Sequence, residues 1–408
     1  MRRIGPWVIL GVTLLLAGCG EPGSDQIPKD LLFIQTAGGV AVVEPGASSP
    51  TVRGRAVPSR DWSTVVRSIP NGTATEIVAF EPSSGAERWG STLPGNLRAK
   101  VVSEDGDLVA LGPTRERHHR LGRASTTVVI VDRGRAEPRT ITLEGNYEPE
   151  AFSTDGQSLF VIKYMPARAP TRYQVRRLDL GTERVEGVYT PDAHLQEAMG
   201  GTARIQAASP DGRRLYTLYT LGGGGEGRYA FIHVLSLDEL WAHCIDLPGE
   251  FATAAESATA LTVSPDGSRL YVANHAEAAV AEIDTSKLEV VRRTSINFGF
   301  GGGAAHAAHD GGSKLYLASG RRVAVVDATK LTEIRSWLLK EKIKGIQVAG
   351  DGTKLYVALR DRVEVLRAAT GDRLDTLDPP GVHRIHRFGP VMPSIDDSNP
   401  GDDIVCAC

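Results

Sequence analysis

The sequence of 408 residues is poor in the groups that many enzymes and nucleic-acid-binding proteins rely on. It has four cysteines, 6% aromatic residues and a formal net charge of −3. A slightly acidic chain without a basic stripe interleaved with aromatics argues against a nucleic-acid partner. The apolar run Val8–Leu16 is too short to cross a bilayer, and no other apolar segment is long enough to do so.

Catalytic signatures are lacking as well. There is no nucleophile elbow, no His-Glu-x-x-His, no redox Cys-x-x-Cys, no dinucleotide-binding glycine pattern and no Cys-x-x-Cys-His haem motif. We therefore expect neither an enzyme nor a bound cofactor. An active site assembled from single residues on several strands would leave no such motif, so an enzyme remains the alternative.

What the chain does have is glycine, 45 residues of it, placed in a repeated pattern. In the stretch 258–274, two alternating apolar and polar runs flank Pro265-Asp266-Gly267. The Asp side chain can accept a backbone hydrogen bond from two residues on, and Gly can adopt the positive φ that closes a hairpin. Two more alternating runs follow at 279–284 and 289–293, which makes one unit of four short antiparallel strands.

This unit recurs along the chain. The same turn occurs at Asp105-Gly106, Asp155-Gly156, Asp211-Gly212, Asp310-Gly311 and Asp351-Gly352, with a degenerate copy at Asp61-Trp62. A four-stranded repeat of about 40–55 residues predicts an all-β protein, a β-propeller of four-stranded antiparallel blades over residues 31–390.

The first blade lacks one strand, because only about fifteen residues separate Gly46 from Asp61. We expect the missing strand to come from 382–388 near the other end. Pairing of these N- and C-terminal strands would close the ring and cover its free edges. Seven repeats plus this shared blade predict eight blades; seven blades with an extra hairpin is the alternative.

The motif Ser-Pro-Asp-Gly-x-x-Leu-Tyr-Val-Ala-Asn from Ser264, followed by an Ile-Asp-Thr turn, resembles the YVTN-type bacterial propeller repeat. That repeat belongs to the quinoprotein-like and WD40-like superfamily, and the resemblance covers roughly Leu31 to Pro390. It implies a fold and no particular function, because propellers serve catalysis, ligand binding and scaffolding alike. The stretch 79–89 resembles a tryptophan-docking motif in a single copy, with Glu81 in place of the usual Asp. We expect Trp89 to pack between blades rather than to mark a pyrroloquinoline quinone site.

The N-terminus has the features of an export signal. Arg2 and Arg3 precede the apolar run, and Leu16-Ala17-Gly18-Cys19 resembles the lipobox of bacterial lipoproteins. The resemblance implies a signal peptide at 1–18, removed before a Cys19 that carries lipid such as palmitate, and a flexible tether at 19–30. We therefore expect an extracytoplasmic lipoprotein anchored to a bacterial cell membrane through Cys19. An ordinary secretory signal with an incidental Cys19 is the alternative.

The remaining cysteines predict little chemistry. Cys244 lies in an apolar strand, where we expect a buried, inert thiol. Residues 391–408 are expected to be an acidic disordered tail that ends in Cys406-Ala407-Cys408. One intervening residue would make a mutual disulfide strained, so a metal pair, a labile redox pair and two free thiols all remain open.

Two groups of residues are candidates for binding. Three insertions fall at the same point of consecutive repeats, between the second and third strands, so they should project from one face toward a partner. Their candidate partner-binding residues are Arg115, Arg117, His118, His119, Arg120, Arg168, Arg172 and Arg228. Solvated hairpin tips are the alternative. His306 and His309 are weak metal candidates, because residues three apart on an extended strand point to opposite faces.

Together these features favour a binding scaffold of the cell envelope, with a protein or polymer partner held on the loop-lined face of the ring. The alternative is a propeller enzyme, either a quinoprotein-like dehydrogenase or a metal-dependent lactonase-type hydrolase. A structural cell-surface protein is a third option.

Overall fold

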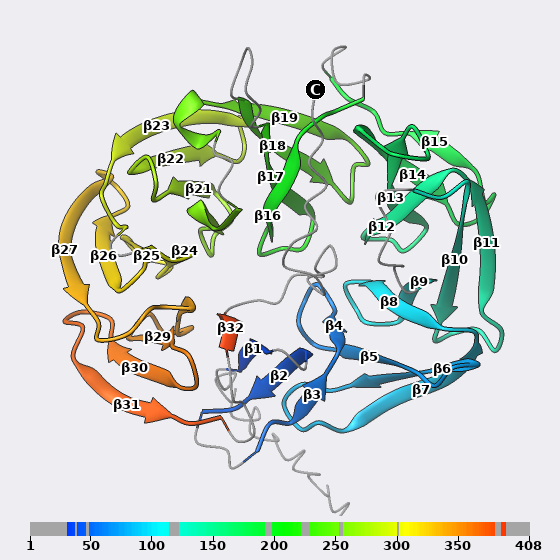
Figure 1. Cartoon of the computed structure of the whole chain (residues 1–408), viewed down its shortest axis with the longest axis horizontal. Coiled ribbons are helices and arrows are strands. Elements are labelled where there is room, and N and C mark those ends of the chain that lie inside the picture. Colours follow the sequence, from blue (N-terminus) through cyan, green and yellow to red (C-terminus); the bar gives the residue numbers. More distant parts are fainter. Residues whose placement is uncertain are drawn as a thin grey trace, which may run out of the picture.

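The computed structural model describes residues 31–36, 39–45, 49–113, 122–191, 198–221, 229–252, 256–299, 302–379 and 385–388. In this part of the chain β-strands are arranged as blades around a central axis (Figure 1). The described residues contain no α-helix and only two short 3-10 helices, η3 (Gly249–Phe251) and η4 (Glu256–Ala258). None of their helices is long and apolar enough to span a bilayer.

Seven blades are built from consecutive strands, numbered here from the innermost outward. Blade 1 is β4 (Ala56–Pro58), β5 (Val65–Pro70), β6 (Ala74–Phe80) and β7 (Glu87–Pro94); blade 2 is β8 (Leu97–Val102), β9 (Leu108–Pro113), β10 (Ser125–Asp132) and β11 (Arg139–Glu144). Blade 3 is β12 (Asn146–Phe152), β13 (Ser158–Met165), β14 (Arg172–Asp179) and β15 (Val185–Gly187); blade 4 is β16 (Thr202–Ala208), β17 (Arg214–Leu221), β18 (Tyr229–Ser236) and β19 (Ala242–Leu247). Blade 5 is β20 (Thr259–Val263), β21 (Arg269–Asn274), β22 (Ala279–Asp284) and β23 (Glu289–Ser295); blade 6 is β24 (Ala305–His309), β25 (Lys314–Ser319), β26 (Arg322–Asp327) and β27 (Thr332–Leu338). Blade 7 is β28 (Gly345–Val348), β29 (Lys354–Ala358), β30 (Val363–Arg367) and β31 (Arg373–Leu377).

The eighth blade is shared between the two ends of the described chain. Its order is β32 (Ile385–Phe388), β1 (Leu32–Thr36), β2 (Gly39–Val43) and β3 (Val52–Gly54). β32 pairs antiparallel with β1, and Phe388 also meets Gly345 of β28 in blade 7. The predictions of eight blades and of closure by a C-terminal inner strand are therefore confirmed, and the seven-blade alternative is wrong.

In the Asp-Gly turn, Asp266 Oδ1 accepts the Ser268 N–H (3.1 Å), which is the hydrogen bond that the sequence predicts. Ser264 Oγ donates to Asp266 Oδ1 (2.5 Å) and accepts the Arg269 N–H (3.0 Å), while Gly267 has φ +73°. In the degenerate copy, Trp62 adopts φ +62° at the glycine position. Its ring packs edge-on against Phe33 at 4.6 Å between ring centroids, so an aromatic contact offsets the unfavourable backbone conformation.

These turns define one face of the ring, called here the turn face. A Cβ added to Gly267 would lie 3.6 Å from Pro210, and one added to Gly311 would lie 3.5 Å from Pro265, so turns of neighbouring blades touch. Because neighbouring strands are antiparallel, the connections between second and third strands lie at the opposite end of each blade. This opposite surface is called the hairpin face.

The core lies between successive blades, where apolar residues of facing sheets interdigitate. Between blades 4 and 5, for example, Leu218, Ile232 and Val272 are fully buried. Trp89 packs against the cluster shared by blades 1 and 2, which confirms the expected blade-packing role. The predicted signal peptide, Cys19 and the tether, as well as the tail 391–408, lie outside the described residues.

Candidate functional site

The predicted partner-binding residues belong to three consecutive blades. Arg168 and Arg172 lie at the β13–β14 connection of blade 3 and are exposed. The other six candidates, in 114–121 of blade 2 and 222–228 of blade 4, lie outside the described residues. On the hairpin face, blades 2 and 3 are joined by a hydrogen bond from the Arg123 N–H to the Ala167 carbonyl (3.0 Å).

The two metal-candidate histidines both lie on β24, the innermost strand of blade 6. An extended strand directs His306 and His309 to opposite faces. His309 stacks on Tyr271 of blade 5 with 5.5 Å between ring centroids, and its Nδ1 accepts the Gly311 N–H (3.0 Å). Within the described residues, no group of three or more His, Cys, Asp or Glu is arranged to hold a metal ion.

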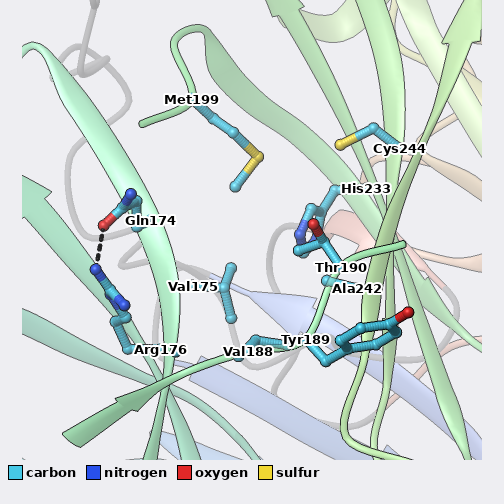
Figure 2. A pocket seen from close by; sticks show the side chains of 11 residues that line it. Gln174, Val175, Arg176, Val188, Tyr189, Thr190, Met199, His233, Ala242 and Cys244 are labelled. Atoms are coloured by element: carbon cyan, nitrogen blue, oxygen red, sulfur yellow. Dashed lines mark hydrogen bonds between the residues drawn. The ribbon is translucent and has the colours of Figure 1, made fainter. Parts of the chain in front are cut away.

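A pocket between blades 3 and 4 arises because β15 is short. This strand pairs only with 176–178 of β14, and the chain then leaves blade 3. Tyr189 forms a parallel bridge with Trp241 of blade 4, and Met199 returns to bridge Tyr173 of β14. The space between the Tyr189–Trp241 bridge and the Met199–Tyr173 bridge is a pocket of about 490 Å³ (Figure 2).

Blades 3 and 4 and the connection between them all contribute to its lining. The lining residues are Gln174, Val175, Arg176, Gly187, Val188, Tyr189, Thr190, Met199, His233, Ala242 and Cys244. Within the pocket, Arg176 Nη2 donates to Gln174 Oε1 (2.8 Å). Tyr189 is 70% exposed, an unusual position for a large aromatic side chain, and it lies at the edge of the pocket.

His233 and Cys244 are directly opposite each other in the pairing of β18 with β19. His233 is buried, and burial followed by the charge of His243 lowers its pKa to about 4, so the ring is neutral at pH 7. The expectation that Cys244 is buried is wrong, because its side chain is half-buried and lines the pocket. Sequence analysis also missed His233 and Met199, because only strand register and the path of the chain bring these residues to Cys244.

A second polar site lies on the inner strands of blades 2 to 4. Glu148 of β12 forms ion pairs with Lys100 of β8 and with Arg123, each at 2.8 Å. Glu150, two residues on, accepts a hydrogen bond from Gln206 Nε2 of β16 (2.6 Å). Burial raises the pKa of Glu150 to about 7, although the Gln206 bond acts the other way; nearby Glu148 adds to the rise.

No family model matches the sequence, and no curated protein matches it. Among solved structures, the chain is similar to the dihydro-heme d1 dehydrogenase NirN in complex with DHE, with TM-score 0.55 and 13% identity over 91% of this chain and 76% of that one. It is equally similar to apo AztD from Citrobacter koseri, with TM-score 0.55 and 13% identity over 88% of this chain and 96% of that one. BamB from Moraxella catarrhalis aligns with TM-score 0.46 and 13% identity, over 80% and 88% of the two chains. At 13% identity, the similarity to the first two structures establishes the β-propeller fold alone.

Proposed function

We propose that this protein is an extracytoplasmic lipoprotein, anchored to a bacterial membrane through lipid on Cys19, whose propeller is a binding scaffold for a protein or polymer of the cell envelope. The hairpin face over blades 2 to 4 is the proposed contact surface. No cofactor and no nucleic acid are part of this proposal.

One observation supports this surface more than any other. From the strand bounds, 11, 6 and 7 residues connect the second and third strands of blades 2, 3 and 4, whereas two to four residues do so in the other five blades. Connections of minimal length suffice to build a blade, so the extra residues in three neighbouring blades need another reason. Enlarged loops on one face of a repeat ring are commonly its recognition surface.

Charge reversal tests the surface. Arg168→Glu with Arg172→Glu alters two exposed residues of the hairpin face, while Arg133→Glu with Arg213→Glu alters two exposed residues of the turn face. The ion pairs lost in the control are exposed and contribute little to stability. We expect the first pair to reduce binding to native envelope fractions at least several-fold and the control pair to leave it unchanged. Equal effects of the two pairs would contradict the proposed surface.

The anchor is tested separately by metabolic labelling with a fatty-acid analogue. The wild-type chain should incorporate the label and sediment with membranes, because two or three acyl chains anchor a protein stably. Cys19→Ser should abolish both properties without altering the thermal unfolding of the propeller. Label that persists in Cys19→Ser would refute the lipid anchor.

A second candidate, a lactonase-type propeller hydrolase, is favoured by Glu150. A carboxyl group with pKa near 7 beside an ion-paired cluster is suited to act as a general base. If so, a panel of lactones should include one hydrolysed by the wild type and not by Glu150→Gln, with a pH profile that rises near 7. An absence of hydrolysis across the panel would leave the scaffold as the sole candidate.

A further inference from the structure

The pairing of β18 with β19 places an imidazole beside a thiol. His233 and Cys244 are cross-strand partners, so their side chains lie on the same face of blade 4 with Cβ atoms about 4.5–5.5 Å apart. Phe231 and Leu235 lie two positions before and after His233 on β18, so their side chains are on the same face as His233. Both pack in clusters shared with blade 3, so this face is turned toward blade 3.

A thioether reaches the same space from a different segment. Met199 is held in place by reciprocal backbone hydrogen bonds with Tyr173 (2.9 and 2.8 Å), and its side chain lines the same pocket. Figure 2 shows the sulfur atoms of Met199 and Cys244 and a ring nitrogen of His233 directed into the space between blades 3 and 4.

The His233 ring lines the pocket. It is 5% exposed and makes an edge-on contact with Tyr219, at 6.3 Å between ring centroids. An imidazole nitrogen is a common metal ligand.

We propose that His233, Cys244 and Met199 bind one Cu(I) ion in the pocket between blades 3 and 4. On binding, the thiol proton of Cys244 leaves to solvent, a Cu–S bond forms, and the metal remains in the +1 state, so no oxidant or reductant takes part. This site is distinct from the contact surface proposed above and extends the function of the protein to holding copper outside the cytoplasm.

The donor set selects this metal. Thiolate and thioether sulfurs favour Cu(I), whereas zinc sites use thiolate, imidazole and carboxylate. The lining of the pocket contains no carboxylate. Arg176, the one cationic group in the lining, is hydrogen-bonded to Gln174, and a Cu(I)–thiolate unit carries no net charge for it to repel.

The test uses the chain from residue 20 with Cys406→Ser and Cys408→Ser, so that Cys244 is its only thiol. The described strands of the ring lie between residues 32 and 388, so these changes leave them intact. Cu(I) is added without oxygen in competition with a colorimetric Cu(I) chelator. We expect one Cu(I) per chain, and a copper-edge X-ray absorption spectrum with two sulfur ligands and one nitrogen ligand.

Variants assign the ligands. Cys244→Ser should abolish stoichiometric Cu(I) uptake. Met199→Leu preserves the size of the side chain and should lower the Cu(I) affinity at least about tenfold, because substitution of residues that only hydrogen-bond to a metal ligand already has an effect of that size. His243→Gln is the matched control, because His243 lies next to Cys244 on the other face of β19. Circular dichroism checks that each variant is folded. No uptake, uptake unchanged in folded Cys244→Ser or Met199→Leu, or a Zn(II) affinity equal to that for Cu(I) would overturn the proposal.

Discussion

Ile34 of β1 lies opposite Phe388 of β32, so strands from the two ends of the described chain form one blade. A propeller that ended on β31 would leave the edges of β1 and β28 exposed. Unpaired strand edges are templates for aggregation, and the single strand β32 meets both of them.

Removal of β32 should therefore be far more harmful than removal of the tail. A chain ending at residue 384 is expected to unfold at a lower temperature and to form oligomers through its exposed edges. A chain ending at residue 390 retains β32 and is the matched control. Differential scanning calorimetry and size-exclusion chromatography compare the two, and equal melting temperatures would show that β32 does not secure the ring.

The serine of the turn motif should contribute measurably to stability. Ser264 is buried, donates to Asp266 and accepts the Arg269 N–H, so Ser264→Ala leaves that amide without its bond. We expect a loss of about 1–2 kcal/mol in the free energy of unfolding. Ser268→Ala, at an exposed position of the same turn, should cost less than about 0.5 kcal/mol. Chemical denaturation of both variants provides the comparison.

An ion-pair network around a buried carboxylate in blade 5 should be sensitive to the loss of that carboxylate. Glu282 is 3% exposed and pairs with Arg269 (3.0 Å) and with Arg292. Glu282→Ala would remove this partner from two guanidinium groups that are 36% and 38% exposed, and a hydrogen bond to a charged group contributes about 1.5–3 kcal/mol. Glu289→Ala, on the exposed strand β23, is the control and should have little effect. Similar melting temperatures for the two variants would contradict this role of Glu282.

The stability of the ring should depend on pH through Glu150. Because burial raises its pKa to about 7, the folded chain holds this proton more tightly than the unfolded chain, whose ordinary value is about 4.5. The resulting stabilisation is complete below about pH 4.5 and is lost as the pH rises through about 7. Glu150→Gln, which stays neutral, should match the wild type at pH 4 and exceed its free energy of unfolding by about 1–3 kcal/mol at pH 8.

Denaturation of both proteins at several pH values measures this difference. Glu148→Gln is a useful contrast, because it removes a carboxylate that is ion-paired with Lys100 and Arg123 and should therefore destabilise the chain at neutral pH. A constant difference between Glu150→Gln and the wild type from pH 4 to pH 8 would show that Glu150 does not titrate in this range.

The sequence predicted the architecture well because its turns are local. Asp266 and Gly267 specify a hairpin through backbone bonds within a few residues, and their recurrence indicates a four-stranded unit. Even the degenerate copy at Trp62 retains the positive φ of the motif. The closing strand was predictable because the N-terminal blade, the eighth blade of the structure, was one strand short.

The pocket was not predictable from the sequence, because its groups meet only in three dimensions. His233 and Cys244 are neighbours through strand register, and Met199 joins them because β15 ends early. The ionisation of Glu150 likewise depends on burial between inner strands and on Gln206 of the next blade. In the sequence, the sign of this pocket was the long connection that follows Gly187, and no rule of sequence analysis relates such a connection to a pocket.

The central claim, that the hairpin face over blades 2 to 4 holds an envelope partner, is tested most directly by site-specific photocrosslinking. A photoreactive amino acid replaces Arg168 on the hairpin face or, as the control, Arg213 on the turn face, in the lipidated protein in its own envelope. The account predicts one discrete crosslinked partner from position 168 and none from position 213. The same products from both positions, or a partner captured only from position 213, would contradict it.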